Sequence, residues 1–561
     1  MKEKYIDLME KALSAYSYKH IMRYFNDVKK SGLKEHGFPR LTADIGILIS
    51  HGRRKDLLPM FLEMMEFCCK SIPCVKAAND FSVREIVCCL LEIEKNNIVS
   101  KEETERWRNY LSTIEPTNCY NQFATSPTDT NVRNWALFSA VSEYFRQNAG
   151  ICDSIKFIEL QLKQQLQWFD ENGMYRDNKH AENRYQHIMY DLVPRGLFSL
   201  LLDQGYRGLS YDVIDATLKK AGLLTLDMQS PNGEMAFGGR SNQFLLNEAW
   251  MIVVFEYEAK RYAHQGNMEL AAKFKAASAR ALAVTEEWLS KEPIRHVKNR
   301  FPTETKYGCE AYAYFDKYMI TVASNLYAAY QICDDSIPFE KTFDHEPCVA
   351  VTSNYFHKLF LKAGGYGLEF DLNADPLYDA NGLGRIHREG APSLICLSSP
   401  CPATPRYVVD IAEPFAFSLC SSIYEDGEWH LGAQANNKYE ILVTDCNNIK
   451  SFAKLRCNFA YGKSIEESYT VDADGVSVFI KGDGKIGFSL PAFCFDGEMH
   501  TKIFADKHSL VVEYNNWLCR YTTSGEIIDL NKTAANRNGH YRAFITTAKN
   551  DLFVKIKISK V

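Results

Sequence analysis

The apolar residues of this chain change their spacing near residue 340. Before that point they recur at intervals of three and four, as in 57–69 and 83–93, which is the spacing of one face of an α-helix. Beyond residue 337 they alternate with a period of two, as in 476–480 and 510–514, which is typical of strands. The sequence therefore predicts an all-α region followed by an all-β region.

The helical region contains many separate segments. Further helical patterns occur at 136–145, 158–169, 245–262, 271–289 and 320–332. The breaks between them are short, as at Ser126-Pro127 and Asn172-Gly173. About ten or more antiparallel helices with short connections predict a barrel or superhelix of helical hairpins. Because no repeat of fixed period is legible, a tetratricopeptide or ankyrin solenoid is disfavoured.

The strand region reads as an antiparallel sandwich. Its expected strands include 355–360, 366–372, 439–443 and 553–558, with turn signals such as Asp474-Gly475 and Gly482-Asp483-Gly484 between them. A chain of 561 residues is also too long for one core. We expect two domains, a helical catalytic domain over 1–340 and a β-sandwich over 341–561.

Charge and cysteine usage exclude several classes of protein. A net charge of −5 gives no reason to expect nucleic acid or an anionic membrane as partner. The start, Met1 to Asp7, has charges and no signal-peptide pattern, and apolar runs such as 251–255 are too short to span a bilayer. The 17 cysteines form no CxxC motif, which predicts reduced thiols in a cytoplasmic protein without structural zinc or a cofactor.

Four clusters of polar and aromatic residues interrupt the helical region. They are Asn134-Trp135, 183–191, 238–243 and 307–314, and their side chains suit stacking on sugar rings and hydrogen bonding to hydroxyls and carboxylates. Helices that deliver such groups from several turns predict an (α/α) toroid with a carbohydrate site at its mouth. The residues expected to contact the sugar there are Asn134, Trp135, Arg184, Tyr185, Asn242, Tyr312 and Tyr314.

The second cluster has the spacing of one helix face. Arg184, His187 and Asp191 are three and four residues apart, and Tyr190 follows His187 by three, while Asp177 lies on the preceding turn. A phenol, an imidazole and a carboxylate within hydrogen-bond reach can transfer a proton. The alternative is a capped helix start in which the tyrosine and histidine make ordinary core contacts.

The third cluster, Gly238 to Asn242, offers a guanidinium beside two glycines. Glycines let the backbone approach a ligand, and the planar fork of Arg240 suits a carboxylate. Glu248 follows Asn242 by six residues and is expected to point to the same mouth. The alternative is a tight turn in which Ser241 caps the next helix.

Two further charged groups are candidates. Glu310 is expected at the start of a buried helix, where an unpaired carboxylate is costly, so it is a candidate general acid or base. The alternative is a structural ion pair with Arg240 or Lys317. His387 lies between two arginines in the glycine-bounded segment 381–390, a basic loop that either hangs over the helical mouth or forms a solvated sheet edge.

The order of these motifs resembles a known group of proteins. Asn134-Trp135, a Tyr/His cluster some fifty residues later, then Gly-Arg-Ser and then a glutamate with aromatics resemble the toroidal carbohydrate-active enzymes, such as heparinase II/III-like lyases. The stretch 107–138 and the sequence GGRSNQF resemble more closely the toroidal glycoside hydrolases that include β-glucuronidases. The likeness covers roughly residues 80–330 and implies a toroid followed by a β-sandwich.

The closer resemblance implies hydrolysis. An inverting hydrolase needs a carboxylic acid of raised pKa and a second carboxylate that holds water. Glu310 or Glu248 would be the acid, and Asp177 or Asp191 the base. On this reading the chain is an exo-acting, β-glucuronidase-like hydrolase of uronic-acid oligosaccharides.

The lyase resemblance implies β-elimination instead. Lyases of this type use Asn, His, Tyr and Arg, and the matching set here is Asn134, His187, Tyr190 and Arg240, with His387 reaching in from the sandwich. Both mechanisms agree with an acidic sugar as substrate. A third class, a non-catalytic helical binding protein, would not need four converging polar clusters. The oligomeric state stays open.

Overall fold

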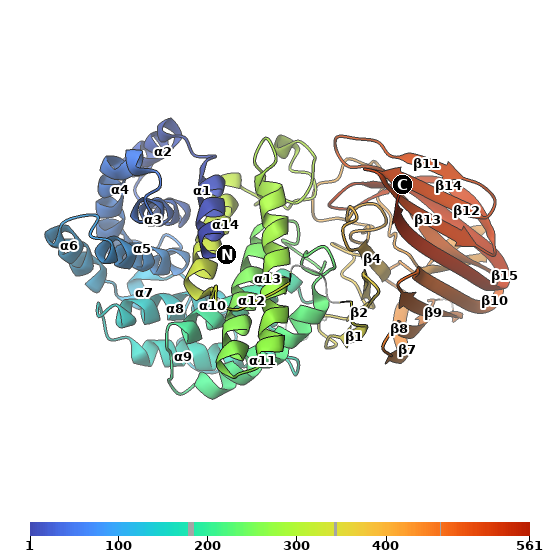
Figure 1. Cartoon of the computed structure of the whole chain (residues 1–561), viewed down its shortest axis with the longest axis horizontal. Helices are drawn as coiled ribbons and strands as arrows, with labels where there is room; N and C mark the ends of the chain where they lie inside the picture. The colour runs from blue at the N-terminus through green and yellow to red at the C-terminus, as the bar shows by residue number, and fades with distance from the viewer. Residues whose placement is uncertain (178–184, 341–344, 461) are drawn as a thin grey trace.

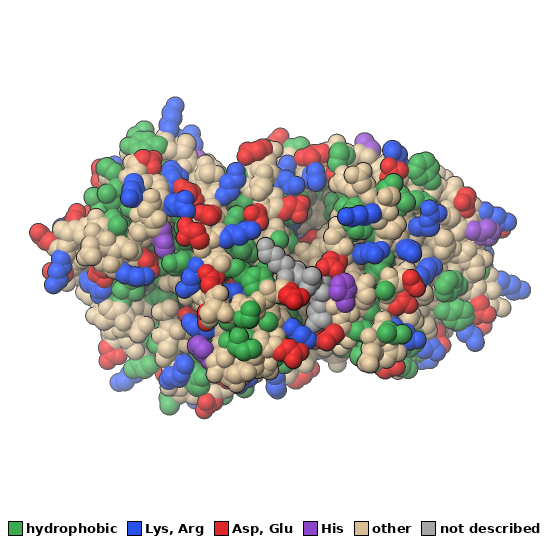
Figure 2. Space-filling model, viewed as in Figure 1, with side chains coloured by type: hydrophobic (Ala, Val, Ile, Leu, Met, Phe, Trp, Pro, Cys, Tyr) green, Lys and Arg blue, Asp and Glu red, His purple; other side chains and the backbone are tan. Residues whose placement is uncertain are grey.

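The computed structural model describes residues 1–177, 185–340, 345–460 and 462–561. The chain is an N-terminal (α/α) toroid followed by an antiparallel β-sandwich, which lie side by side in Figure 1. Basic and acidic side chains are interspersed over the face shown in Figure 2. Within the described ranges, no helix combines the length and apolar character needed to cross a lipid bilayer.

The described helices all precede residue 333. Their bounds are α1 Lys2–Leu13, α2 Tyr18–Ser31, α3 Gly37–Ser50, α4 Leu58–Ser71, α5 Val83–Lys95, α6 Lys101–Ser112, α7 Pro116–Cys119, α8 Trp135–Asn148, α9 Ile155–Leu166, α10 Ile188–Asp203, α11 Tyr211–Met228, α12 Leu246–His264, α13 Met268–Leu289 and α14 Phe315–Ile332. Short 3₁₀ turns include η3 Asn79–Phe81 and η4 Thr303–Thr305.

Among the described residues, six helices form a closed inner ring. In order around it, α3, α5, α8, α10, α12 and α14 each contact the next, and α14 contacts α3 again. These helices are apolar on nearly every side: α3 buries 37–49 without a break, and α12 buries almost its whole length. Outer helices such as α2 bury one stripe only, at Ile21, Phe25 and Val28. Tight ring packing is visible at Gly46 of α3, where a Cβ would lie 2.3 Å from Sγ of Cys89.

The strands begin at Cys348. They are β1 Cys348–Val351, β2 Lys358–Ala363, β3 Tyr366–Asp371, β4 Gly382–Arg388, β5 Ser421–Glu425, β6 Glu428–Leu431, β7 Lys438–Cys446, β8 Ser451–Asn458, β9 Ser464–Asp472, β10 Gly475–Phe495, β11 Lys502–Ala505, β12 Ser509–Tyr514, β13 Trp517–Thr523, β14 Glu526–Ala535 and β15 His540–Lys560.

These strands form two antiparallel sheets. The first has the order β1-β2-β3-β4, and the second is built around the long pair β10 and β15. Strand β2 contacts β8 and β9 of the second sheet, which makes the two layers of the sandwich. The turn expected at 482–484 lies inside β10, where the register shifts between Lys481 and Lys485.

The prediction of a basic loop at 381–390 is wrong, because Gly382–Arg388 form strand β4, which is buried except at Arg388. A glycine is needed within it, since a Cβ on Gly384 would lie 2.5 Å from Cζ of Phe237 in the toroid. The first sheet therefore packs directly against the helical part. Residue 340 lies between the end of α14 and the start of β1, and the division there into two independent domains stays a prediction.

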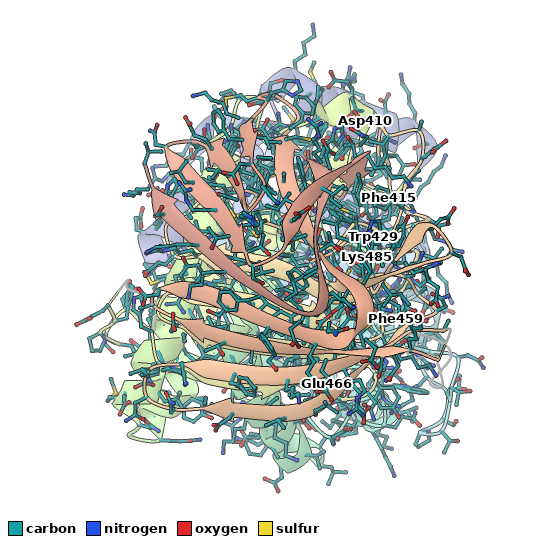
Figure 3. The ribbon with its side chains drawn as sticks, turned by 90° about the vertical axis from the view of Figure 1, so that its right-hand side faces the viewer. Asp410, Phe415, Trp429, Phe459, Glu466 and Lys485 are labelled. Carbon is teal, nitrogen blue, oxygen red and sulfur yellow. The ribbon has the colours of Figure 1, made fainter. Side chains whose placement is uncertain are left out.

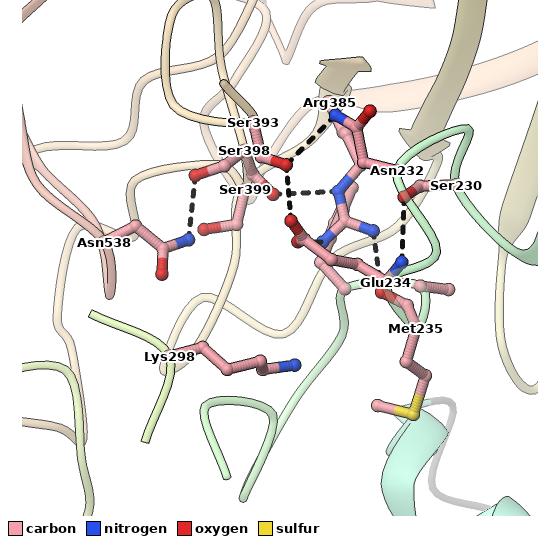
Figure 4. Close-up of polar contacts among 12 residues, drawn as sticks. Ser230, Asn232, Glu234, Met235, Lys298, Arg385, Ser393, Ser398, Ser399 and Asn538 are labelled. Carbon is pink, nitrogen blue, oxygen red and sulfur yellow. Dashed lines mark hydrogen bonds and ion pairs between the residues drawn. The ribbon is translucent and has the colours of Figure 1, made fainter. Parts of the chain in front are cut away.

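A buried polar network joins the two parts (Figure 4). Arg385 of β4 donates to the carbonyl oxygens of Met235 at 2.7 Å and Ser398 at 2.9 Å, and the Ser393 hydroxyl donates to the Glu234 carboxylate. Asn538 donates to the Ser398 hydroxyl at 2.8 Å. These bonds fix the backbone of the toroid just before the Gly238-Gly239-Arg240 segment.

Gly46→Ala tests the packing of the inner ring. Alanine favours a helix by about 1 kcal/mol over glycine, yet here we expect the free energy of unfolding to fall by about 1–3 kcal/mol, because the new Cβ meets Cys89 and Phe61. Denaturant unfolding measures it. Adding Cys89→Ala should recover part of the loss. A single variant as stable as the parent would contradict the tight contact between α3 and α5.

Candidate active site

A cavity of about 1060 Å³ opens at the N-terminal ends of the inner helices. The residues before the first turns of α3, α8 and α10, which are His36, Asn134 and His187, all line it. The first turns of α12 and α14 contribute Leu246 and Lys317. The N–H groups at a helix start have no partner within the helix and carry the positive end of its dipole. The cavity therefore lies where several such ends converge.

Most of the charged side chains that line this cavity are cations. The cations among them are Arg40, Lys76, Arg133, Arg240 and Lys317. Asp177 is the only carboxylate among the lining residues that the structure describes. An excess of cations at converging helix N-termini favours a ligand with negative charge.

A smaller cavity of about 290 Å³ lies in the sandwich. Phe415 and Trp429 line it, and Figure 3 shows both near one edge of the sandwich. Lys485 lies beside them, with its ammonium 5.4 Å from the Trp429 ring. The described lining residues include no histidine or tyrosine, so this cavity has fewer groups suited to proton transfer than the toroid cavity.

Asp177 lies two residues after the Phe169–Tyr175 bridge, outside any helix, strand or turn, and it lines the cavity. The backbone N–H of Asn134 hydrogen-bonds its carboxylate, and Oδ1 has no hydrogen-bond partner in the described ranges. Burial raises the pKa of Asp177 to about 6, although the positive charges of Arg240 and Arg133 oppose the rise. Its carboxyl group therefore titrates close to neutral pH.

His187 precedes α10 and faces the cavity. The backbone N–H of Arg240 donates to its Nδ1 at 3.3 Å, so in the neutral ring the proton is on Nε2. Burial, with the positive charges of Arg240 and Arg537, lowers the pKa of His187 to about 3. The close approach needs Gly239, whose φ is +78° and whose Cβ would lie 2.1 Å from Nδ1. His187 is thus a neutral hydrogen-bond donor.

Tyr190 sits beneath Arg240. The guanidinium carbon lies 4.6 Å from the centre of the phenol ring. The Tyr190 hydroxyl is 3.2 Å from Oγ of Ser241, which is 2.7 Å from the Tyr312 hydroxyl. Burial raises the pKa of Tyr312, so its phenol stays protonated. The three hydroxyls form a chain that can relay a proton, beside a cation that stabilises negative charge on the first.

Glu310 does not line the cavity. It precedes α14 in the turn 308–314, not on the helix that was expected, and it accepts hydrogen bonds from the Ser241 backbone N–H and from Arg537, both at 2.8 Å. Glu310 thus forms its ion pair with Arg537 of the sandwich. The predicted pairing with Arg240 or Lys317 is wrong. Glu310 holds Ser241 at its φ of +65°, a conformation that non-glycine residues seldom adopt.

Other expected carboxylates are paired inside the protein. Glu248 accepts from the Lys298 ammonium at 2.7 Å and from the Met235 backbone N–H at 3.2 Å, and it does not line the cavity. Asp191 is fully buried, and its carboxylate is paired with Arg195 at 2.5 Å. Neither carboxylate meets a ligand in this arrangement.

Of the remaining residues expected to contact the sugar, some line the cavity and others do not. Trp135 and Tyr312 line the cavity, whereas Tyr185, Asn242, Tyr314 and His387 do not. Tyr314 is 58% exposed, and Asn242 donates to the Ala236 carbonyl at 3.0 Å. His387 is buried in β4, where burial and Arg385 lower its pKa to about 3. Arg184 lies outside the described residues.

Sequence reasoning missed several cations. Arg537 lies in Asn536-Arg537-Asn538-Gly539, which reads as a plain hairpin turn, and nothing local to it points to Glu310. Arg133 directly precedes Asn134-Trp135, and its guanidinium lies 3.6 Å from the centre of the Trp168 ring. Its position next to Asn134-Trp135 was the one feature of the sequence that could have identified Arg133 as a cavity residue. In the described ranges, no group of three His, Cys, Asp or Glu side chains is arranged to hold a metal ion.

Comparison with known proteins yields structural similarity only. No family model matches the sequence, and no curated protein matches it. Among solved structures, the chain is similar to a mutant of the heparan sulfate lyase HepC from Pedobacter heparinus, at 10% identity and a TM-score of 0.47 over 93% of this chain and 76% of that one. It is also similar to the heparinase III BT4657 gene product, at 10% identity and a TM-score of 0.43 over 93% and 78%.

A third similar structure is a chondroitin lyase, the baculovirus envelope protein ODV-E66, at 10% identity and a TM-score of 0.44 over 93% of this chain and 76% of that one. The heparinases among these proteins are of the kind that the sequence motifs resemble. At such identities and TM-scores, the function of this chain has to be argued from its own cavity.

Glu310→Gln tests whether Glu310 is structural. Removing one partner of a buried ion pair leaves Arg537 uncompensated, so we expect a loss of about 3 kcal/mol in the free energy of unfolding. Thermal unfolding measures it, with the exposed Glu304→Gln as control. A variant that keeps its melting temperature but loses about 10²–10⁴ in rate would instead make Glu310 the proton donor.

Proposed function

We propose that this protein is a lyase that cleaves uronic-acid-containing oligosaccharides or polysaccharides by β-elimination. The observation that carries the proposal is the set Asn134, His187, Tyr190 and Arg240, which lines one cavity together with a single described carboxylate. The excess of positive charge in that cavity supports an acidic sugar as the substrate.

Elimination first requires that the uronate carboxylate be held and its charge offset. Arg240 has an Nε without a hydrogen-bond partner in the described ranges, and its planar fork suits two carboxylate oxygens. The Nε2–H of His187 and the amide of Asn134 add neutral donors. Together these groups stabilise the negative charge that develops on the carboxylate as the C5 proton leaves.

Tyr190 is then the proton carrier. Its phenolate, stabilised by Arg240, takes the C5 proton, and the C4–O bond breaks with its electron pair left on the departing oxygen. A C4=C5 double bond forms, and Tyr190 returns the proton to that oxygen. The Ser241 and Tyr312 hydroxyls can carry a proton between Tyr190 and water when the phenolate is formed.

Hydrolysis is the second candidate, and Asp177 is the observation in its favour. A carboxyl group with a pKa of about 6 suits a general acid. An inverting hydrolase, however, needs a second carboxylate about 6.5–9.5 Å away. Glu310 and Glu248 are both held in ion pairs away from the cavity lining, which is why we favour elimination.

Product analysis with Tyr190→Phe separates the two reactions. Uronic-acid oligosaccharides should give the absorbance of a conjugated unsaturated uronate, and Tyr190→Phe should lower the rate by about 10²–10⁴ because the proton carrier is lost. The matched control is Tyr314→Phe, an exposed tyrosine outside the cavity lining, which should keep full activity. New reducing ends without that absorbance would mean hydrolysis, and then Asp177→Asn should be the more damaging variant.

Binding should also depend on pH through Asp177. As pH falls through about 6, protonation removes the negative charge of Asp177, so an acidic oligosaccharide should bind Tyr190→Phe more tightly at pH 5 than at pH 7.5. The affinity should rise roughly tenfold between pH 7.5 and pH 5 if oligosaccharide binding raises the pKa of Asp177 by one unit. His187 stays neutral over this range.

Calorimetric titration of the oligosaccharide measures this effect. The control is Asp177→Asn in the same Tyr190→Phe background, which should bind equally at both pH values. A pH dependence that persists in that double variant would assign the effect to another group.

A further inference from the structure

A second group of cations lines the cavity on a different arc of the helical ring. The proposed catalytic groups come from α8, α10 and the segment before α12. His36 and Arg40 come from the start of α3, and Lys317 and Thr321 come from the first turns of α14. Because α14 and α3 are neighbours in the ring, these four residues face the cavity from one side.

The four side chains form one cluster. Nη1 of Arg40 donates to Oγ1 of Thr321 at 2.8 Å. Burial and the positive charges of Arg40 and Lys317 lower the pKa of His36, which places all three groups within electrostatic reach of one another. His36 also lies against Phe81, with the two ring centres 4.8 Å apart.

This cluster has hydrogen-bonding capacity that the described protein does not use. His36 is 9% exposed and Arg40 is 3% exposed, yet Nδ1 of His36 and Nε of Arg40 have no hydrogen-bond partner in the described ranges. Buried donors and acceptors are nearly always satisfied in folded proteins. Both residues line the same cavity, so their unused nitrogens leave hydrogen-bonding capacity there for a ligand.

The positive charge of the cluster is also only partly balanced. Glu85 lies 3.3 Å from Arg40 but 2.6 Å from Arg84, so it is shared between two guanidinium groups. Burial raises the pKa of Asp44 well above its usual range, so its carboxyl group adds little negative charge there. No ion pair with Lys317 is recorded in the described part of the chain. A net cation at a helix N-terminus is suited to an anion.

We propose that His36, Arg40, Lys317 and Thr321 form a second anion subsite, which binds a carboxylate or sulfate group on a sugar other than the one whose carboxylate meets Arg240. This inference rests on the proposed function only for the identity of the ligand. It implies that the preferred substrate carries at least two anionic groups, one on each side of the cavity.

Anion binding can be measured without any reaction. Inorganic sulfate should raise the pKa of His36, because an anion beside Arg40 and Lys317 stabilises the imidazolium, and NMR titration of the His36 ring protons follows it. His36→Gln identifies the signal by its loss. Lys317→Gln should weaken the sulfate effect at least severalfold, while the exposed Lys34→Gln should leave it unchanged. A His36 pKa that does not move at saturating sulfate would overturn the subsite.

Oligosaccharides then identify the natural anion. In Tyr190→Phe, which removes turnover, calorimetry compares a uronate oligomer that carries only carboxylates with a uronate–hexosamine tetrasaccharide that carries one sulfate. Lys317→Gln should raise the Kd of at least one of these ligands about tenfold. The control Lys34→Gln should leave both Kd values unchanged. Equal Kd values in Lys317→Gln and Lys34→Gln for both ligands would overturn the subsite.

The two proposals fail in different ways. If the subsite binds anions but no unsaturated uronate forms with any substrate, elimination is wrong and the subsite stands. If elimination occurs and Lys317→Gln changes neither KM nor the His36 titration, the subsite is wrong and the lyase stands.

Discussion

The carboxylate of Glu310 is the contact on which the arrangement of the cavity depends. It joins Arg537, in the turn between β14 and β15, to the backbone N–H of Ser241 in the toroid. Arg537 also donates to the carbonyl oxygens of Gly308 and Gly239. One buried ion pair therefore fixes the segment that carries Arg240 and Ser241, and the sandwich acts as the support of the site. A buried pair of this kind adds specificity of position more than stability.

The ring of inner helices supplies the second constraint, which is the electrostatic character of the cavity. Helix N-termini from α3, α8, α10, α12 and α14 border it, and each presents the positive end of its helix dipole there. Burial, with the positive charges of Arg240 and Arg537, lowers the pKa of His187 to about 3, and the charges of Arg240 and Arg133 limit the rise in the pKa of Asp177 to about 6. An excess of positive charge favours an anionic ligand, which supports the acidic sugar that we propose as substrate.

Local patterns in the sequence were enough to predict the toroid, the sandwich and part of the site. His187, Tyr190 and Arg240 lie in short polar segments beside apolar helices, and such segments are unusual enough to be noticed. The pairing of Glu310 with Arg537 spans 227 residues, and no local signal encodes it. Strand β4 was misread as a loop because Gly384 and Arg385 are explained by close packing against the toroid, which only the fold reveals.

The choice between elimination and hydrolysis then depends on which groups are free to react. Glu310 was the first candidate acid in the sequence, yet an acid already committed to Arg537 and Ser241 cannot also protonate a leaving group without dismantling the turn that holds Arg240. Tyr190 has no such commitment: its hydroxyl contacts only Ser241 among the described residues for which a hydrogen bond is recorded, and Arg240 lies over its ring. His187 stays neutral because its pKa is lowered to about 3, so in the proposed mechanism its Nε2–H would offset carboxylate charge and Tyr190 would transfer the proton. A neutral donor, a fixed cation and a phenol can together offset the charge of a uronate carboxylate and move its C5 proton, and this combination is why we propose β-elimination.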